Sequence, residues 1–138
     1  MALPDLIGAI VAYARLQSAL TTLTSTRISG ERKASWGLPA YAIVVNGPKG
    51  GPPVEAPRRR VRVDMECYGP DSRTSKVLAE TVVSVFAPDS GPSTTFNLAN
   101  CRVGEVSKEA EPIWLPDREQ GWPRTIVPLL FTFTPEDA

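Results

Sequence analysis

Apolar residues near the start of the chain recur at helical spacing. Pro4 suits the first turn of a helix, and Asp5 suits its positive N-terminal end. The pattern therefore predicts an amphipathic helix over residues 3–23 that packs against the core. Its broad apolar face holds Leu3, Leu6, Ile10, Tyr13, Leu16, Leu20 and Leu23.

A strict alternation of apolar and charged residues marks the middle of the chain. This period of two is typical of a half-buried strand with one apolar and one charged face. The apolar positions are Val61, Val63, Met65 and Cys67, and the charged positions are Arg60, Arg62, Asp64 and Glu66. A β-branched run at residues 41–45 predicts the preceding strand, and residues 47–57, rich in glycine and proline, predict a long loop. Together the two strands are expected to form a hairpin with an unusually long tip.

The second half of the chain predicts one helix and two strands. Asp71 or Ser72 can cap the helix, which extends to Phe86 and carries the apolar stripe Leu78, Val82, Val85 and Phe86. A weaker strand is expected at residues 101–106 and a final strand at 125–134. Pro128 cannot donate to a strand ladder, so it predicts a sheet edge or a bulge in the final strand.

These elements follow the order helix, strand, strand, helix, strand, strand. Strands that succeed one another through short links favour antiparallel pairing. We therefore expect a single α+β domain over residues 1–138, with an antiparallel sheet of about four strands, two helices packed on one face and a long hairpin loop.

Composition narrows the range of functions. Fifteen basic residues balance fifteen acidic residues, and this zero net charge argues against a dedicated duplex-DNA binder. The chain has no histidine, the commonest general base and metal ligand, and two cysteines alone cannot build a zinc site. We expect no metal or cofactor. Cys67 and Cys101 are expected to be buried thiols, with a disulfide between them left open.

The apolar N-terminal segment does not have the pattern of a targeting signal. It lacks a basic start, and Tyr13, Arg15 and Gln17 interrupt its apolar run. We expect neither a signal peptide nor a membrane span, and a cytoplasmic protein.

No catalytic motif stands out. The glycines of "GPKGGPP" have prolines beside them, which remove amide donors from any phosphate loop. Asp64 and Glu66 share a strand face, but neutralisation by neighbouring arginines is the simpler interpretation. The role of Asp117 and Glu119, catalytic or structural, is likewise left open by the sequence. We therefore do not expect an enzyme.

Two tryptophans lie in the irregular residues 111–124. Trp114 and Trp122 could stack on single-stranded nucleic acid, anchor a protein partner, or pin their own loop onto the sheet. Zero net charge favours the protein partner over the nucleic acid.

Four segments together resemble a known family. They are "LPDLIGAIVAYARL", "RRVRVDMECYGPD", "SRTSKVLAETVVSVF" and "EPIWLPDREQGWPRTIVPLLFTF", and they span nearly the whole chain. In this order they resemble the tail terminator (tail-completion) proteins of bacteriophages with long, non-contractile tails. The shared motifs are patterns rather than catalytic signatures, and the proline-rich tip and Pro128 are not features that the family requires.

The resemblance implies a structural role in the virion. Such a protein is a small α+β subunit of a hexameric ring that caps the last ring of the tail tube and stops tube polymerisation. The ring then meets the head-tail connector or stopper protein, and genomic DNA passes through its channel without sequence-specific binding. The implied location is the neck of the virion, after assembly in the host cytoplasm, with no membrane partner.

Two sets of residues are candidates for the contacts of such a ring. Ring subunits use heterologous contacts, for which a strand face of two signs is suited. The predicted subunit interface is Arg60, Arg62, Asp64, Glu66, Trp114, Asp117, Arg118 and Trp122. The predicted arm that contacts the tail tube is Lys49, Gly50, Gly51, Pro52, Pro53, Val54, Glu55, Arg58 and Arg59.

Three alternatives remain at the level of sequence. A head-completion or stopper protein of the neck differs from a terminator in its partner rather than in its class. A nucleic-acid-binding module would use residues 58–62 and the tryptophans. A small enzyme would need a pair of perturbed carboxylates in a pocket.

Overall fold

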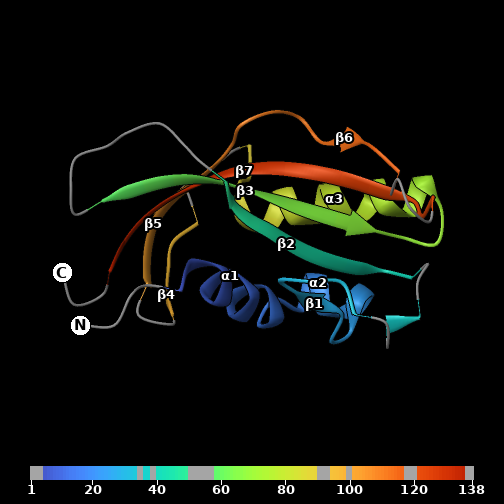
Figure 1. Cartoon of the computed structure of the whole chain (residues 1–138), viewed down its shortest axis with the longest axis horizontal. Coiled ribbons are helices and arrows are strands. Elements are labelled where there is room, and N and C mark those ends of the chain that lie inside the picture. Colours follow the sequence, from blue (N-terminus) through green and yellow to red (C-terminus); the bar gives the residue numbers. More distant parts are fainter. Residues whose placement is uncertain are drawn as a thin grey trace.

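The chain folds as a curled mixed sheet with the described helices on one face (Figure 1). The computed structural model describes residues 5–33, 36–37, 40–49, 58–89, 94–98, 101–116 and 121–135. The helices within them are α1 (Leu6–Arg15), α2 (Ser18–Thr24) and α3 (Ser72–Phe86). The strands are β1 (Ile28–Ser29), β2 (Ala42–Lys49), β3 (Arg59–Tyr68), β4 (Phe96–Leu98), β5 (Cys101–Lys108), β6 (Ile113–Trp114) and β7 (Arg124–Pro135).

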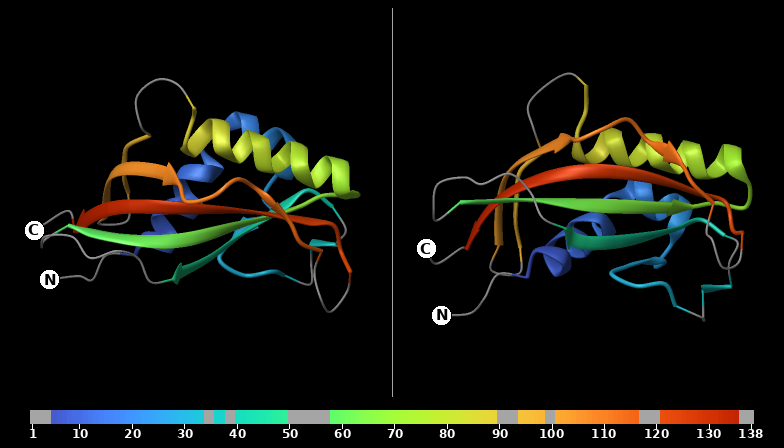
Figure 2. Two further views of the ribbon diagram at one scale, coloured as in Figure 1. Left: turned by 90° about the horizontal axis from the view of Figure 1, so that it is seen from above. Right: turned by 45° about the horizontal axis from the view of Figure 1, so that its top comes forward.

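The two longest strands form the centre of the sheet. The strand order is β1-β2-β3-β7-β5-β4, and β6 pairs with β7 beyond the end of β5. β1 and β2 are parallel, and every other described pair is antiparallel. Helix α1 contacts both edge strands, β1 and β4, so the sheet curls around it as a half-barrel. Figure 2 shows the three helices on the same side of the sheet.

The expected fold of four antiparallel strands and two helices is wrong. The structure has three helices and a mixed sheet of seven strands in its described residues. The missed strands β1, β4 and β6 are two or three residues long, too short for a periodic pattern to reveal. They exist because a longer neighbouring strand offers backbone groups to pair with.

The predicted N-terminal helix is two helices. α1 and α2 are bent by 85° at their break. The bend brings Leu20 into the core and leaves Leu16, predicted on the apolar face, 71% exposed. Asp5 caps α1 by accepting a hydrogen bond from the Gly8 amide at 2.8 Å. Of the described helices, none alone is long and apolar enough to cross a membrane, and α1 and α2 reach that length only when joined across the bend.

The predicted hairpin is confirmed as the antiparallel pair of β2 and β3. β2 continues past the Asn46-Gly47 dipeptide to Lys49, with a shift of register between Asn46 and Lys49. A Cβ atom at Gly47 would lie 3.3 Å from the carbonyl oxygen of Arg62. Gly47 therefore allows close approach at a strand irregularity instead of starting a turn. The tip, residues 50–57, lies outside the described part of the chain.

Pro128 lies in a central strand rather than at the edge of the sheet. β7 is bordered by β3 on one side and by β5 and β6 on the other. The Pro128 carbonyl accepts from the Glu109 amide at 3.0 Å, on the side where β5 has ended at Lys108. In an antiparallel strand the N–H and C=O of one residue point to the same side, so the N–H that Pro128 lacks falls in the gap between β5 and β6.

Helix α3 begins and packs as its sequence predicts. Asp71 is the N-cap, and its side chain accepts from the Thr74 amide in a capping box. These hydrogen bonds from Thr74 lower the pKa of Asp71. The buried face presents Leu78, Val82 and Phe86 to the sheet.

The core has a main cluster and a small satellite. The main cluster fills the space between the helices and the sheet, and it includes the unpaired thiols of Cys67 and Cys101. Burial raises the pKa of both thiols, that of Cys101 to about 11, so neither is a ready nucleophile. The satellite lies on the opposite face of the sheet and consists of Ala42, Val44 and Tyr68 with Trp36 and Trp122 packed against them.

Candidate protein-interaction surface

The predicted charged face of β3 lies on the side of the sheet opposite the helices. Because Val63, Met65 and Cys67 are in the main core, the alternate positions Arg60, Arg62, Asp64 and Glu66 point away from it. We call these four residues the β3 strip. The two acids are nearly buried, with side-chain exposures of 7% for Asp64 and 11% for Glu66.

Asp64 is buried because Arg62 covers it. The Arg62 guanidinium donates from Nε to Oδ1 at 3.0 Å and from Nη2 to Oδ2 at 3.1 Å. This two-point geometry is the strongest form of an arginine–carboxylate pair, and the hydrogen bond to Asp64 raises the pKa of Arg62. Glu109 adds a longer contact to Arg62 at 3.9 Å.

Glu66 is held by side chains from three strands. Asn46 on β2 donates to it at 2.6 Å, and Arg124 on β7 and the Tyr68 hydroxyl each lie 3.4 Å away. Arg60, at the other end of the strip, donates to the Thr132 hydroxyl at 3.1 Å. Each charge of the strip therefore has a partner inside the subunit, and the strip ties β2, β3 and β7 together. Its role as a subunit interface stays a prediction.

Exposed large apolar side chains are concentrated at β6, and one more lies on α3. Ile113, Trp114 and Leu115 are 49%, 40% and 41% exposed, and Val77 of α3 is 43% exposed. We call these four residues the β6 surface. β6 pairs with β7 alone among the described strands, and the Leu115 amide extends this pairing by donating to the Arg124 carbonyl at 3.0 Å. An apolar edge strand open to solvent is a ready template for association.

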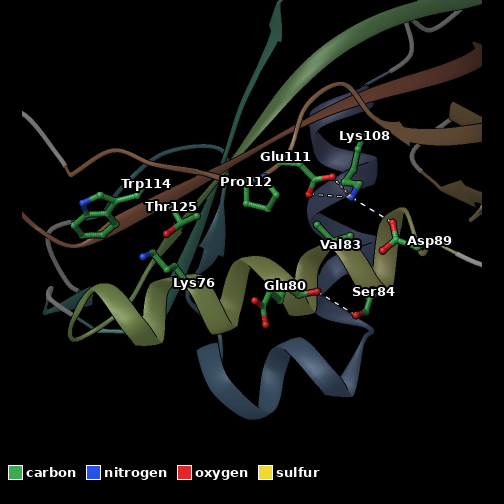
Figure 3. A pocket seen from close by; sticks show the side chains of 10 residues that line it. All are labelled: Lys76, Glu80, Val83, Ser84, Asp89, Lys108, Glu111, Pro112, Trp114 and Thr125. Atoms are coloured by element: carbon green, nitrogen blue, oxygen red, sulfur yellow. Dashed lines mark hydrogen bonds and ion pairs between the residues drawn. The ribbon is translucent and has the colours of Figure 1, made fainter.

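A groove of about 610 Å³ separates α3 from the segment that carries β6 (Figure 3). It is lined by Lys76, Glu80, Val83 and Ser84 of α3, by Asp89, Lys108, Glu111, Pro112 and Trp114, and by Thr125 of β7. Figure 3 shows the Lys108 ammonium between Asp89, at 3.3 Å, and Glu111, at 3.0 Å. These carboxylates raise the pKa of Lys108. At the other end, the Lys76 ammonium lies 5.9 Å from the centre of the Trp114 ring, at the outer limit of a cation–π contact.

The hydroxyl groups at the groove make hydrogen bonds to neutral partners. Ser84 donates to the Glu80 carbonyl of its own helix, and Ser75 shares a hydrogen bond with Thr125, so neither hydroxyl has a basic partner. Among the described residues there is no group of three or more histidine, cysteine, aspartate or glutamate side chains that could hold a metal ion. At one end of the groove Lys108 pairs with Asp89 and Glu111, and at the other end Lys76 lies near Trp114.

The structure separates the two predicted tryptophans. Trp114 lies on β6 beside α3, whereas Trp122 packs on the satellite cluster with the Arg32 guanidinium 4.7 Å from its ring centre. Asp117 and Arg118 lie outside the described residues. So do Gly50, Gly51, Pro52, Pro53, Val54 and Glu55 of the predicted arm, as does the side chain of Lys49. Arg58 and Arg59 of the arm are exposed at the start of β3.

The sequence prediction missed three residues of the β6 surface. Val77 follows the polar start of α3, and Ile113 and Leu115 flank Trp114. The run "PIWLP" offered a signal, because three large apolar residues between prolines cannot extend into a long strand or a helix and so have few ways to be buried.

Comparison of the chain with known protein families, with characterised proteins and with solved structures found no match. Proposals about its function therefore depend on its own residues and on the surfaces they form.

Proposed function

We propose that the chain is a structural virion protein that assembles into a ring at the head-proximal end of a bacteriophage tail tube. There it ends tube polymerisation and joins the tail to the head connector. The four sequence segments that resemble tail terminators support the proposal, and one structural observation carries it: the exposed apolar β6 surface on an edge strand.

The β6 surface has the features of a subunit contact. Trp114 supplies the large aromatic area that anchors protein interfaces, and Ile113 and Leu115 next to it in the chain and Val77 of α3 add further exposed apolar area. The edge of β6 that faces away from β7 can also pair with a strand of a neighbour. A ring needs heterologous contacts, so the β6 surface of one subunit would meet a different face of the next.

The β3 strip is less suited to the central contact. Its acids already accept hydrogen bonds inside the subunit, and pulling one away to pair with a neighbour would leave a nearly buried charge without its partner. Within the proposal, the strip stiffens the subunit, and Trp114 is the predicted interface residue on which association depends most.

Electron microscopy of the purified chain mixed with its polymerising tail-tube protein tests the proposal. Wild type should stop tube growth and leave a ring at one tube end. Leu115→Ser should fold but fail to cap, because it places a hydroxyl in the apolar contact. The matched control is Leu16→Ser, since Leu16 is also exposed and apolar but lies at the α1–α2 bend.

Three outcomes would contradict the proposal. The chain could bind nowhere on the tube, tubes could grow to full length in its presence, or both serine variants could cap as wild type does. Virions made without the protein separate the related neck role: overlong tails indicate a terminator, and free tails of normal length indicate a stopper.

A further inference from the structure

A basic hollow lies at the end of α1, on residues that the proposed function does not use. It has a volume of about 370 Å³ and is lined by Arg15, Thr26, Arg27, Lys33 and Trp36. A second hollow of about 470 Å³ adjoins it and is lined by Arg15, Thr21, Ser25 and Thr26. The two share Arg15 and Thr26. We call the pair the Arg15 hollow, and among the described residues no acidic side chain lines either part.

Backbone carbonyls hold the two guanidinium groups in place. Arg15 donates from Nε and Nη2 to the Ile28 carbonyl at 3.2 and 2.7 Å, and Arg27 donates from Nε to the Tyr41 carbonyl at 2.7 Å. A guanidinium has five N–H donors, so each group keeps donors for a ligand. A carbonyl fixes the side chain without neutralising its charge, and this lowers the entropy lost when an anion binds.

The cations of the hollow have no carboxylate partner within the described chain. The ion pairs of the described residues involve Arg62, Lys108 and Arg124. None of them involves Arg15, Arg27 or Lys33. In residues 15–36 the sequence has four basic residues and a single acid, Glu31, although the chain as a whole is neutral. The neutral total therefore conceals a local excess of positive charge.

The remaining lining residues indicate what kind of anion fits. Trp36 is half-buried because it packs on the satellite cluster, so its ring is supported from behind. Bases of nucleic acids stack on such rings whatever their sequence. The hydroxyls of Thr21, Ser25 and Thr26 are of the kind that contact phosphate and sugar oxygens. Two adjoining hollows that share an arginine also offer room for successive nucleotides.

We propose that the Arg15 hollow binds nucleoside phosphates, with the phosphate on Arg15, Arg27 and Lys33 and a base against Trp36, and that they belong to a single strand of nucleic acid. This assignment does not rest on the proposed ring assembly. Whether the chain caps a tail tube or not, the hollow is formed within one subunit.

Fluorescence anisotropy with a labelled oligothymidylate of eight nucleotides tests the assignment over a series of salt concentrations. Lys33→Gln should weaken binding and reduce the slope of log K against log salt by about 0.7, the value for one lost phosphate contact to a single strand. Trp36→Leu should weaken it about fivefold or more, through loss of base stacking. Arg102→Gln, which removes the same charge from an exposed site on β5, should leave binding unchanged.

The Lys33 side chain is exposed and makes no hydrogen bond among the described residues, and its backbone carbonyl accepts from the Trp36 amide at 3.1 Å whatever the side chain is. Lys33→Gln therefore tests the site even if Arg15→Gln or Arg27→Gln disturbs the backbone. If thymidine monophosphate competes as strongly, per nucleotide, as the oligothymidylate, the site binds nucleoside phosphates. The ligand would then be a free nucleotide and not a strand. Equal binding of polyglutamate, equal competition by inorganic phosphate, or equal losses in Lys33→Gln and Arg102→Gln would overturn the assignment. So would the absence of binding at low salt.

Discussion

Two arginine-bearing regions of this molecule differ in what their charges contact. In the β3 strip, Arg62 pairs with Asp64 and Arg124 approaches Glu66, so the charges are satisfied within one subunit. In the Arg15 hollow, Arg15 and Arg27 donate to neutral carbonyls, and neither forms an ion pair with a carboxylate of the described chain. The strip is conspicuous in the sequence, and the hollow is not.

This difference shows that a run of charge in a sequence does not measure charge available for binding. The arginines of residues 58–62 stand together in the chain, but Arg60 donates to Thr132 of the neighbouring strand β7, and Arg62 pairs with Asp64 of its own strand. Arg15 and Arg27 are twelve positions apart in the sequence, yet they line one hollow, because the chain turns back after α2. Whether an arginine can bind a ligand is decided by the groups that lie beside it in the folded chain.

The largest effect is expected where a satisfied charge loses its partner. Glu66→Ala removes the acceptor shared by Asn46, Tyr68 and Arg124, and leaves the Arg124 guanidinium without its carboxylate in a nearly buried place. We expect a loss of about 2–3 kcal/mol in the free energy of unfolding, between the cost of one charged hydrogen bond and that of a broken buried pair. Urea unfolding at constant m-value measures it.

The matched control for that experiment is Glu105→Ala, since Glu105 is an exposed acid on β5. It should change the free energy of unfolding by less than about 0.5 kcal/mol. Equal losses of unfolding free energy in the two variants would show that the internal partners of Glu66 do not stabilise the fold. The β3 strip would then not differ from the Arg15 hollow in having its charges satisfied.

The longest elements were predictable because their periodicity is strong. The alternation in residues 60–67 marked β3, and the apolar stripe ending at Phe86 marked α3 together with its Asp71 cap. The break between α1 and α2 was not predictable from the sequence, because no glycine or proline lies at positions 16 and 17. Contact of Leu20 with the core bends the chain there, and a single-sequence pattern carries no such tertiary information.

The candidate surfaces were predictable only as sets of residues. Sequence placed Asp64 and Glu66 on one strand face correctly, but two residues that donate to Glu66 are 20 and 58 positions away, in β2 and β7. Trp114 was a candidate, whereas its exposure depends on where β5 ends and β6 begins. The Arg15 hollow requires the end of α1 to meet strand β1, 13 residues later.

An intermediate effect on stability is expected at Asp71, a charged residue that has hydrogen-bond partners but is exposed to solvent. Hydrogen bonds from Thr74 lower the pKa of Asp71, so the folded chain holds the ionised form more strongly than the unfolded chain does. The resulting stability is present above the unfolded pKa of about 3.9 and is lost as the pH falls through the lower folded value. Asp71→Asn, which keeps an acceptor at the cap, should be less stable than wild type at pH 7 and should converge with it in acid.

Asp71→Ala provides the comparison for that titration, because it removes the cap acceptor as well as the charge. Its deficit against Asp71→Asn should stay nearly constant with pH. A gap between wild type and Asp71→Asn that does not narrow in acid would mean that the stability difference does not come from the charge of Asp71.

The smallest effect is expected in the hollow, and it has the opposite sign. Arg15, Arg27 and Lys33 are like charges around one space, so Lys33→Glu should relieve their repulsion and raise the free energy of unfolding by up to about 0.5 kcal/mol at low salt. At 1 M salt, where screening acts within about 3 Å, the gain should vanish. The same charge reversal at the exposed Arg102 should give no comparable gain. A loss of stability in Lys33→Glu at low salt would mean that Lys33 has a favourable partner in the folded chain, and the hollow would then belong with the strip, as a region whose charges are already satisfied.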